Sequence, residues 1–261
     1  MAKKHARYAV GIDIGGTGIK GGLVDLKHGK LEGKRQKVKT PQGAPIDAVR
    51  EAVREVYDLI LAQDVAAQHG EAPVGICMPA VVRHGRSESA ANIDQEWIGF
   101  DARGAFSEVI GTPVSLVNDA DAAGYGEVRF GAAADNTGSV LVLTLGTGIG
   151  SALVHGGRLV PNTELGHLEL DGHPDYERYA SSKVREREGL SFEEWGERLT
   201  PYFKHLDRLF SPDEFVVSGG VSKQAEDFLH LIEVDVPVIA ATLRNNAGII
   251  GAGLLGAEHW D

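Results

Sequence analysis

The chain has 261 residues, of which 43% are apolar and 24% are charged, a composition typical of a globular protein with one large domain or two lobes. Its net charge of −11 argues against a general nucleic-acid binder, so a polyanionic ligand has to meet a local basic surface on an acidic body. A single cysteine, Cys77, excludes both a disulfide scaffold and a cysteine-based zinc site.

The N-terminal segment, MAKKHARYAVG, is basic but lacks the apolar core and the cleavage site of a signal peptide. No apolar run approaches the roughly 20 residues that a membrane-spanning helix requires. Together with the lone cysteine, these features predict a cytoplasmic protein with no membrane partner.

The first predicted elements surround the stretch Gly11–Asp25, which reads GIDIGGTGIKGGLVD. The apolar run Tyr8–Ile14 contains one carboxylate, Asp13, and breaks into a glycine turn beside Thr17 and Lys20. Glycine permits positive φ and lets backbone N–H groups approach a ligand, so such a turn suits phosphate. A neighbouring carboxylate suits the Mg²⁺ that accompanies phosphate. The alternative interpretation is an ordinary hairpin turn.

The same stretch also contains a G-x-G-x-x-G pattern, Gly16–Gly21, which by itself suggests a dinucleotide fold. That fold requires a helix after the glycines and an acidic residue about 20 positions further on. Here a short apolar run leads into Asp25 instead, and this context excludes hydride transfer with NAD. The region that follows is basic and contains Lys27, Lys30, Lys34, Arg35, Lys37 and Lys39.

The middle of the chain places a carboxylate, Asp119, where a predicted strand ends and a helix begins. Enzymes of the α/β class place catalytic groups at such positions, and an aspartate there can accept the proton of an attacking hydroxyl. The alternative is a helix N-cap, which Asn118 or Asp119 would supply. The predicted elements are helix Ile46–Leu61, strand Val74–Met78, helix Asp101–Ile110 ended by Gly111, strand Pro113–Val117 and helix Ala120–Glu127.

A second glycine turn follows the predicted strand Ser139–Leu145. Its residues Gly146–Ile149 repeat Gly16–Ile19 letter for letter, and Leu-Val follows each turn at the same offset. The repeat predicts a duplicated half-domain. Two such hairpins facing each other across a cleft would hold opposite sides of one phosphate chain.

The second half also contains two polar clusters. Glu164 and His167 would bind sugar hydroxyls by accepting and donating together, unless they form a surface turn. The densest basic run there is either a solvated helix face or a surface for an extended polyphosphate. It contains Arg178, Lys183, Arg185 and Arg187.

The last third continues the alternation of helices and strands, which predicts an α/β fold. Ser191 and Glu194 form a capping box that opens a helix, and Thr200-Pro201 predicts a kink or a fresh helix start. Gly219-Gly220 suits the close approach of a flat ligand such as adenine, or a tight turn. The remaining predicted elements are strand Phe215–Val217, helix Lys223–Ile232, strand Pro237–Ala240 and helix Asn246–Ala257.

Three motifs, in this order, resemble those of the actin-like sugar kinases. Asp13-Ile-Gly-Gly-Thr17 is similar to the first phosphate motif, Leu145–Gly150 to the second, and Val216–Ser222 to the adenosine motif. Asn118-Asp119-Ala120 with Glu164-x-x-His167 resembles the ROK family (repressors, open reading frames, kinases), along essentially the whole chain.

The chain departs from that family at its zinc motif. ROK proteins typically follow the histidine with a cysteine-rich segment, whereas residues 171–181 read DGHPDYERYAS here. Glu177 and Tyr-Ala-Ser are kept and the cysteines are gone, so no zinc is expected. This form, with ANIDQEWIG at 91–99 and GGTGIK at 15–20, resembles the polyphosphate-using glucokinases and glucomannokinases of the family.

The resemblance implies an actin-like ATPase (ribonuclease H-like) fold with two lobes, each with a mixed sheet flanked by helices, and a cleft between them. Residues 1–117 would form the small N-terminal lobe, on which the C-terminal helix 246–261 packs back. Residues 118–245 would form the large C-terminal lobe. The family also suggests a homodimer.

The resemblance further implies phosphoryl transfer from polyphosphate, ATP or both to the 6-hydroxyl of glucose, with mannose as a second candidate hexose. Asp119 would be the general base, and Asp13 would hold Mg²⁺ through water. Gly219 and Gly220 would flank adenine. The hexose would contact Asn92, Asn118, Asp119, Glu164, His167 and Glu177. The phosphoryl groups would contact Gly15, Gly16, Thr17, Gly18, Lys20, Thr144, Gly146, Thr147 and Gly148.

Two other functions compete with the kinase. A sugar-responsive repressor needs a DNA-binding helix-turn-helix ahead of the kinase body, where only residues 1–10 precede the first motif. A sugar-binding protein without kinase activity would not need Asp13, Asp119 and both glycine turns. The motifs do not discriminate ATP from polyphosphate, because both donors present a terminal phosphoryl group to the same residues. Glucose and mannose differ in one hydroxyl and are equally undecided.

Overall fold

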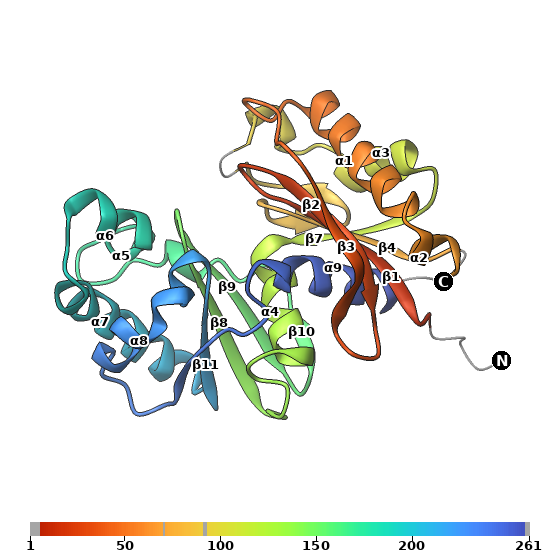
Figure 1. Cartoon of the computed structure of the whole chain (residues 1–261). Coiled ribbons are helices and arrows are strands. Elements are labelled where there is room, and N and C mark those ends of the chain that lie inside the picture. Colours follow the sequence, from red (N-terminus) through yellow and green to blue (C-terminus); the bar gives the residue numbers. More distant parts are fainter. Residues whose placement is uncertain (1–5, 70, 91–92, 259–261) are drawn as a thin grey trace. The chain divides into compact units, whose positions relative to one another are not determined.

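The computed structural model describes residues 6–69, 71–90 and 93–258. The chain divides into two compact units, one of residues 1–126 with 246–261 and one of residues 127–245 (Figure 1). One predicted sugar-binding residue, Asn92, lies outside the described residues.

The first unit is built on a five-stranded sheet of order β3-β2-β1-β4-β7. β1, β2 and β3 form an antiparallel meander because short turns connect them, whereas β4 and β7 run parallel to β1 after helical crossovers. The strands are β1 (Tyr8–Ile14), β2 (Ile19–Asp25), β3 (Lys30–Val38), β4 (Val74–Met78) and β7 (Val114–Asn118), with a small hairpin of β5 (Val82–Arg83) and β6 (Arg86–Ser87). The helical segments are α1 (Ile46–Leu61), α2 (Asp64–Ala67), η1 (Gln95–Trp97) and α3 (Ala102–Ile110).

Both long helices of this sheet layer agree with their sequence patterns. The apolar stripe of α1 is buried at Val49, Val53, Val56 and Ile60. α3 begins after Asp101, whose side chain accepts from the Gly104 N–H at 3.1 Å, and it ends at Gly111 in the left-handed conformation.

The C-terminal helix α9 (Ala247–Glu258) packs on the sheet of the first unit at backbone-to-backbone distance. A Cβ on Gly11 would lie 1.9 Å from the Ile249 carbonyl oxygen, and one on Gly75 would lie 1.8 Å from that of Ala252. Glycine is required at these strand positions because no side chain fits between the helix and the sheet.

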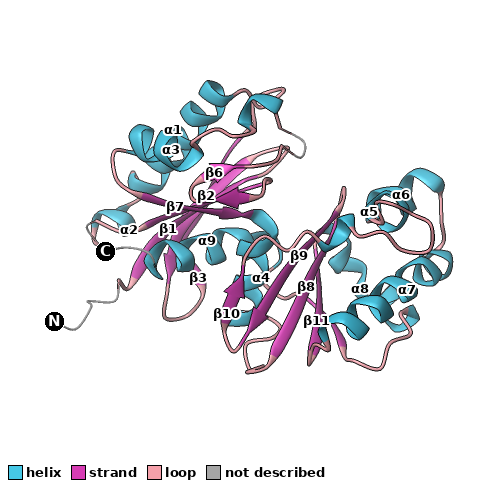
Figure 2. Ribbon diagram, turned by 180° about the vertical axis from the view of Figure 1, so that it is seen from behind, coloured by secondary structure: helices cyan, strands magenta, loops and turns pink. Residues whose placement is uncertain are grey.

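The second unit has a five-stranded sheet of order β10-β9-β8-β11-β12, the same topology as the first. The duplicated half-domain predicted from the repeated turn is therefore confirmed. Helices α5 to α8 gather on one side of this sheet (Figure 1, Figure 2). The strands are β8 (Ser139–Leu145), β9 (Ile149–His155), β10 (Arg158–Val160), β11 (Glu214–Ser218) and β12 (Val238–Ala240). The helical segments are α4 (Asp119–Phe130), which crosses the boundary between units, η2 (Leu165–His167), α5 (Glu177–Ala180), α6 (Ser182–Glu188), α7 (Phe192–Phe210), η3 (Gly220–Gln224), α8 (Ala225–Phe228), η4 (Leu229–Leu231) and η5 (Arg244–Asn246).

One of the two alternatives at Thr200-Pro201, a fresh helix start, is wrong, and so is the continuous helix expected for 223–232. The capping box of Ser191 and Glu194 opens α7 as predicted, but α7 runs on through Pro201 instead of starting afresh there. Its buried apolar face offsets the hydrogen bond that proline cannot make. The helix predicted for 223–232 is broken into η3, α8 and η4, because Phe228 leaves helical backbone at φ −141°.

Among the described helices, none combines the length and apolar composition needed to cross a bilayer.

Candidate active site

Each sheet carries a glycine turn between its first two strands. Residues 15–18 join β1 to β2, and residues 146–148 join β8 to β9. The Gly15 N–H donates to the Gly18 carbonyl at 3.2 Å, and the Gly146 N–H donates to the Gly148 carbonyl at 3.0 Å. Neither turn uses positive φ, although its glycines would permit it.

Both turns keep backbone donors available. Within the described part of the chain, the N–H groups of Gly16, Thr17 and Gly18 have no protein acceptor, and the same holds for those of Thr147 and Gly148. Adjacent free N–H groups in a turn form a binding site for an anion.

The glycines of the predicted motifs fall into two kinds. A Cβ on Gly16, Gly146 or Gly220 would meet nothing within 4 Å, and none of the three has positive φ. Neither packing nor backbone conformation therefore requires glycine at these three positions. Glycine would be required there if a ligand came close to the backbone. Gly219 differs, because its φ is +94° and a Cβ there would lie 2.3 Å from the Leu145 carbonyl oxygen.

A cavity of about 230 Å³ in the second unit adjoins the second glycine turn. It is smaller than the roughly 300 Å³ at which drug-sized pockets begin, so it has room for part of a nucleotide. Just before the turn, the Thr144 hydroxyl is buried without a partner. The lining residues are Leu145, Gly146, Thr147, Ser182, Lys183, Glu186, Gly220, Val221 and Gln224. Sequence reasoning named Lys183 only as part of the basic run, and it missed Ser182, Glu186 and Gln224, although the Tyr-Ala-Ser motif directly precedes α6.

Asp13 lies at the end of β1, with its side chain 18% exposed. One carboxylate oxygen is 3.4 Å from the Lys20 ammonium, and the other is 3.8 Å from the Cys77 sulfur. Burial raises the pKa of Asp13, and the Lys20 charge opposes this shift. A single, partly exposed carboxylate beside a phosphate-type turn fits Mg²⁺ held through water rather than in a protein cage.

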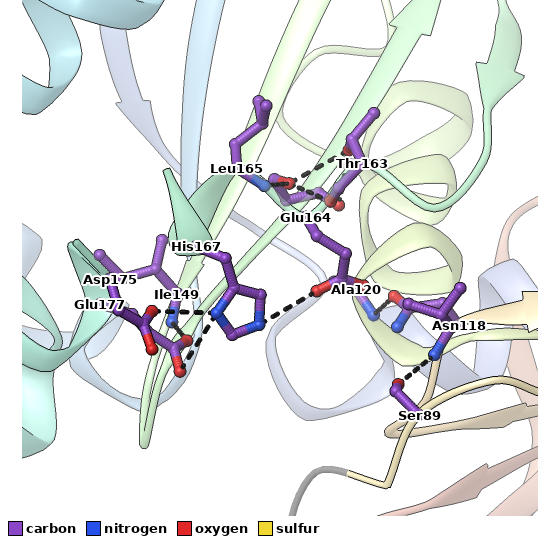
Figure 3. Close-up of polar contacts among 12 residues, drawn as sticks. Ser89, Asn118, Ala120, Ile149, Thr163, Glu164, Leu165, His167, Asp175 and Glu177 are labelled. Atoms are coloured by element: carbon purple, nitrogen blue, oxygen red, sulfur yellow. Dashed lines mark hydrogen bonds and ion pairs between the residues drawn. The ribbon is translucent and has the colours of Figure 1, made fainter. Parts of the chain in front are cut away.

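The side-chain hydrogen bonds of Asn118 show which residue caps helix α4. The Asn118 side-chain oxygen accepts from the N–H groups of Ala120 at 2.8 Å and Asp121 at 3.1 Å (Figure 3). Its amide nitrogen donates to the Ala80 carbonyl at 3.1 Å. Asn118 is therefore the N-cap of α4. Asp119 is the first helical residue, and it is partly exposed.

His167 is the centre of a carboxylate network in the second unit (Figure 3). Its Nδ1 lies 2.9 Å from Asp175 and 4.0 Å from Glu177, and its Nε2 lies 3.7 Å from Glu164. The hydrogen bond to Asp175 raises the pKa of His167, and the other carboxylates add to this effect. Burial raises the pKa of Glu164. Sequence reasoning brought Glu164, His167 and Glu177 together but missed Asp175, which it quoted only as part of the altered zinc segment.

Glu177 contacts both this network and the second glycine turn. Its Oε2 accepts from the Ile149 N–H at 2.9 Å, and a Cβ on Gly148 would lie 2.2 Å from that oxygen. Gly148 is glycine because the Glu177 carboxylate lies directly over the turn.

One atom each of His167, Asp175 and Glu177 lies close enough to the others to hold a metal ion. The set supplies three ligands, whereas structural zinc takes four, and the Asp175 hydrogen bond already occupies Nδ1. We therefore interpret the cluster as a hydrogen-bonding network.

Three of the four cations in the basic run of the second half are paired with nearby carboxylates. Arg178 lies 2.7 Å from Asp175, Lys183 lies 3.8 Å from Glu186, and Arg187 lies 2.9 Å from Glu188. The Arg185 guanidinium stacks 4.1 Å from the centre of the Phe192 ring. These contacts favour the solvated helix face over the polyphosphate surface.

Two sheets of identical topology, each opening with a glycine turn that suits phosphate, define the class as an actin-like phosphotransferase fold. The chain belongs to the ROK family, which residues 9–186 match.

Several similar proteins are named as sugar kinases. The chain is 44% identical to the polyphosphate glucokinase of Mycobacterium tuberculosis (strain H37Rv), over 95% of this chain and 91% of that one. It is 50% identical to the crystal structure of the inorganic polyphosphate/ATP-glucomannokinase from Arthrobacter sp. strain KM, with a TM-score of 0.91 over 97% and 99% of the two chains. A ROK family glucokinase from Streptomyces griseus, solved with glucose and AMPPNP, is 27% identical, with a TM-score of 0.73 over 94% and 98%.

Proposed function

We propose that this chain is a sugar kinase that transfers the terminal phosphoryl group of polyphosphate or ATP to the 6-hydroxyl of glucose. The observation that carries the proposal is the spare room at Gly16, Gly146 and Gly220. Neither packing nor φ requires glycine there, so a ligand in contact with the backbone is the remaining reason for it. The names of the relatives support the same reaction.

In this proposal the turns bind the donor. Free backbone N–H groups at residues 16–18 and 147–148 donate to phosphoryl oxygens, and the Lys20 ammonium adds positive charge. The buried Thr144 hydroxyl gains a partner when a phosphoryl oxygen binds. Mg²⁺, held through water by Asp13, would neutralise charge on the phosphoryl group. With ATP as donor, the cavity beside Gly220 would take the adenine end.

Asp119 is the proposed general base. Asn118 caps α4, and one oxygen of the partly exposed Asp119 carboxylate accepts from the Ala120 N–H at 2.8 Å. In the proposed reaction it accepts the proton of the 6-hydroxyl, a role typically worth about 10²–10⁴-fold in rate.

The hexose would be bound by Asn92, Asn118, Asp119, Glu164, His167 and Glu177. Asp175 holds the Nδ1 side of His167, which leaves Nε2 to meet a sugar hydroxyl. Glu164 supplies acceptor oxygens beside that nitrogen. The proposal also includes mannose as a second substrate, a cytoplasmic location, a homodimer and no bound zinc.

A coupled assay of glucose and mannose, each with ATP and with polyphosphate, tests the reaction. We expect phosphorylation of glucose with at least one donor, and no phosphorylation under all four conditions would overturn the proposal. Calorimetric binding of glucose without any turnover would support the alternative, a sugar-binding protein without kinase activity.

The base is tested with Asp119→Asn. We expect kcat to fall by about 10²–10⁴-fold while glucose still binds. Asp47→Asn is the matched control, since Asp47 is an exposed aspartate in the first turn of α1. Near-normal turnover of Asp119→Asn would remove this residue from the role of base.

A further inference from the structure

A row of cations crosses the first sheet beside its glycine turn. Asp13 on β1 is directly opposite Lys20 on β2, and Lys20 is directly opposite Lys37 on β3. Directly paired residues of neighbouring strands point to the same face of a sheet. Arg35, two residues before Lys37, lies at a bulge of β3, and its charge acts on Asp13 and opposes the rise that burial causes in the pKa of that carboxyl.

The row places three cations, Lys20, Lys37 and Arg35, beside one acid, Asp13. Lys20 is paired with Asp13 at 3.4 Å, and Arg35 donates to the neutral Asn246 side chain at 3.1 Å. Lys37 is exposed and has no anionic partner within the described part of the chain. This contrasts with the basic run of the second unit, where three of the four cations have a carboxylate partner.

The side chains of the row lie against the phosphate-type turn. A Cβ on Gly18 would lie 2.4 Å from Cε and 3.4 Å from Nζ of Lys37. A Cβ on Gly15 would lie 3.7 Å from Nζ of Lys20. The missing side chain of Gly18 thus leaves room for the Lys37 side chain, and the Lys20 ammonium lies at contact distance from Gly15.

We propose that Lys20, Lys37 and Arg35 form a track for an inorganic polyphosphate donor, which binds the phosphate units beyond those held by the turn. This inference rests on the proposed function. Cross-strand neighbours are about 5 Å apart, and alternate residues of a strand are about 7 Å apart, so the cations recur at short intervals. Every unit of a polyphosphate carries negative charge, whereas ATP ends in a neutral nucleoside after three phosphates. Lys37 and Arg35 therefore favour the longer polyanion.

The test compares donors in Lys37→Gln and in Arg35→Gln/Lys37→Gln, with glucose saturating. We expect kcat/KM for long-chain polyphosphate to fall roughly fivefold per cation removed, relative to kcat/KM for ATP. The slope of log KM for polyphosphate against log salt concentration should become shallower by about 0.7 per cation, as for single-stranded nucleic acids.

Lys34→Gln is the matched control, because Lys34 is an exposed lysine of the same strand on the opposite face. It should leave both donors unchanged. Lys37→Arg should keep the polyphosphate preference, and Lys37→Glu should weaken it further.

An equal effect of Lys37→Gln on both donors, or none on either, would overturn the inference. So would equally tight binding of single-stranded DNA and polyphosphate, both weakened by the substitution, since the row would then be a general anion surface. Wild-type activity with ATP but not with polyphosphate would refute the track and leave the kinase standing. Inactivity with both donors would refute the proposed function itself.

Discussion

Two kinds of glycine in this protein should respond in opposite ways to the same added methyl group. At Gly146 an alanine Cβ meets nothing within 4 Å, and φ is ordinary. Gly146→Ala should therefore fold at least as well as the wild type, because alanine reduces the entropy of the unfolded chain by about 0.4–1 kcal/mol. The melting temperature should be unchanged or rise by about 1–4 °C.

The same substitution should impair the reaction. A methyl group at Gly146 stands where a phosphoryl oxygen would approach the turn, and a lost charge-assisted hydrogen bond costs about 1.5–3 kcal/mol. The expected loss in kcat/KM is about 10–150-fold.

Gly75→Ala should instead destabilise the folded protein. Its Cβ would lie 1.8 Å from the Ala252 carbonyl oxygen, so α9 has to move off the sheet. Overpacking of this kind costs about 1–3 kcal/mol or more, which lowers the melting temperature by roughly 5–10 °C. Thermal denaturation by circular dichroism and steady-state kinetics measure both variants. A Gly146→Ala protein that is stable and within threefold of wild-type kcat/KM would refute the reasoning, as would one that fails to fold.

Two further predictions concern buried and networked carboxylates. Asp175→Asn should bring the pKa of His167 down toward 6.5 and raise KM for glucose more than it changes kcat; an unchanged histidine titration by NMR would contradict this. The hydrogen bond between His167 and Asp175 favours the protonated form of His167. Its contribution to folding stability is therefore complete below pH 6.5, and it is lost as the pH rises through the higher pKa that His167 has in the folded protein. Glu127→Gln should destabilise the protein by about 2–4 kcal/mol in urea denaturation, because the buried Glu127 carboxylate accepts from three backbone N–H groups and an amide nitrogen cannot accept. The exposed Glu55→Gln on α1 is its control, and equal stability of the two variants would show that the carboxylate is not required.

Local sequence was sufficient where a short pattern decides the backbone. The Ser191 capping box, the helix end at Gly111, the amphipathic stripe of α1 and the repeated turn all predicted their elements. It failed at 223–232, where helical spacing continues but the backbone leaves the helix at Phe228. Glycine composition also left the backbone of the two turns open, since their glycines permit positive φ but do not use it.

The sequence by itself determined the family, the order of the motifs and the duplication, because these are written in contiguous letters. Only the tertiary structure showed which residue caps α4, which carboxylates contact His167, and at which positions packing requires glycine. The reason is that these depend on residues far apart in the chain, as when Glu177 lies over Gly148 or Ala252 meets Gly75. The role of the cations also depends on the tertiary structure. In the basic run of residues 178–187, Arg178 and Lys183 are paired with carboxylates. Lys37 lies beside the first glycine turn because β3 pairs with β2.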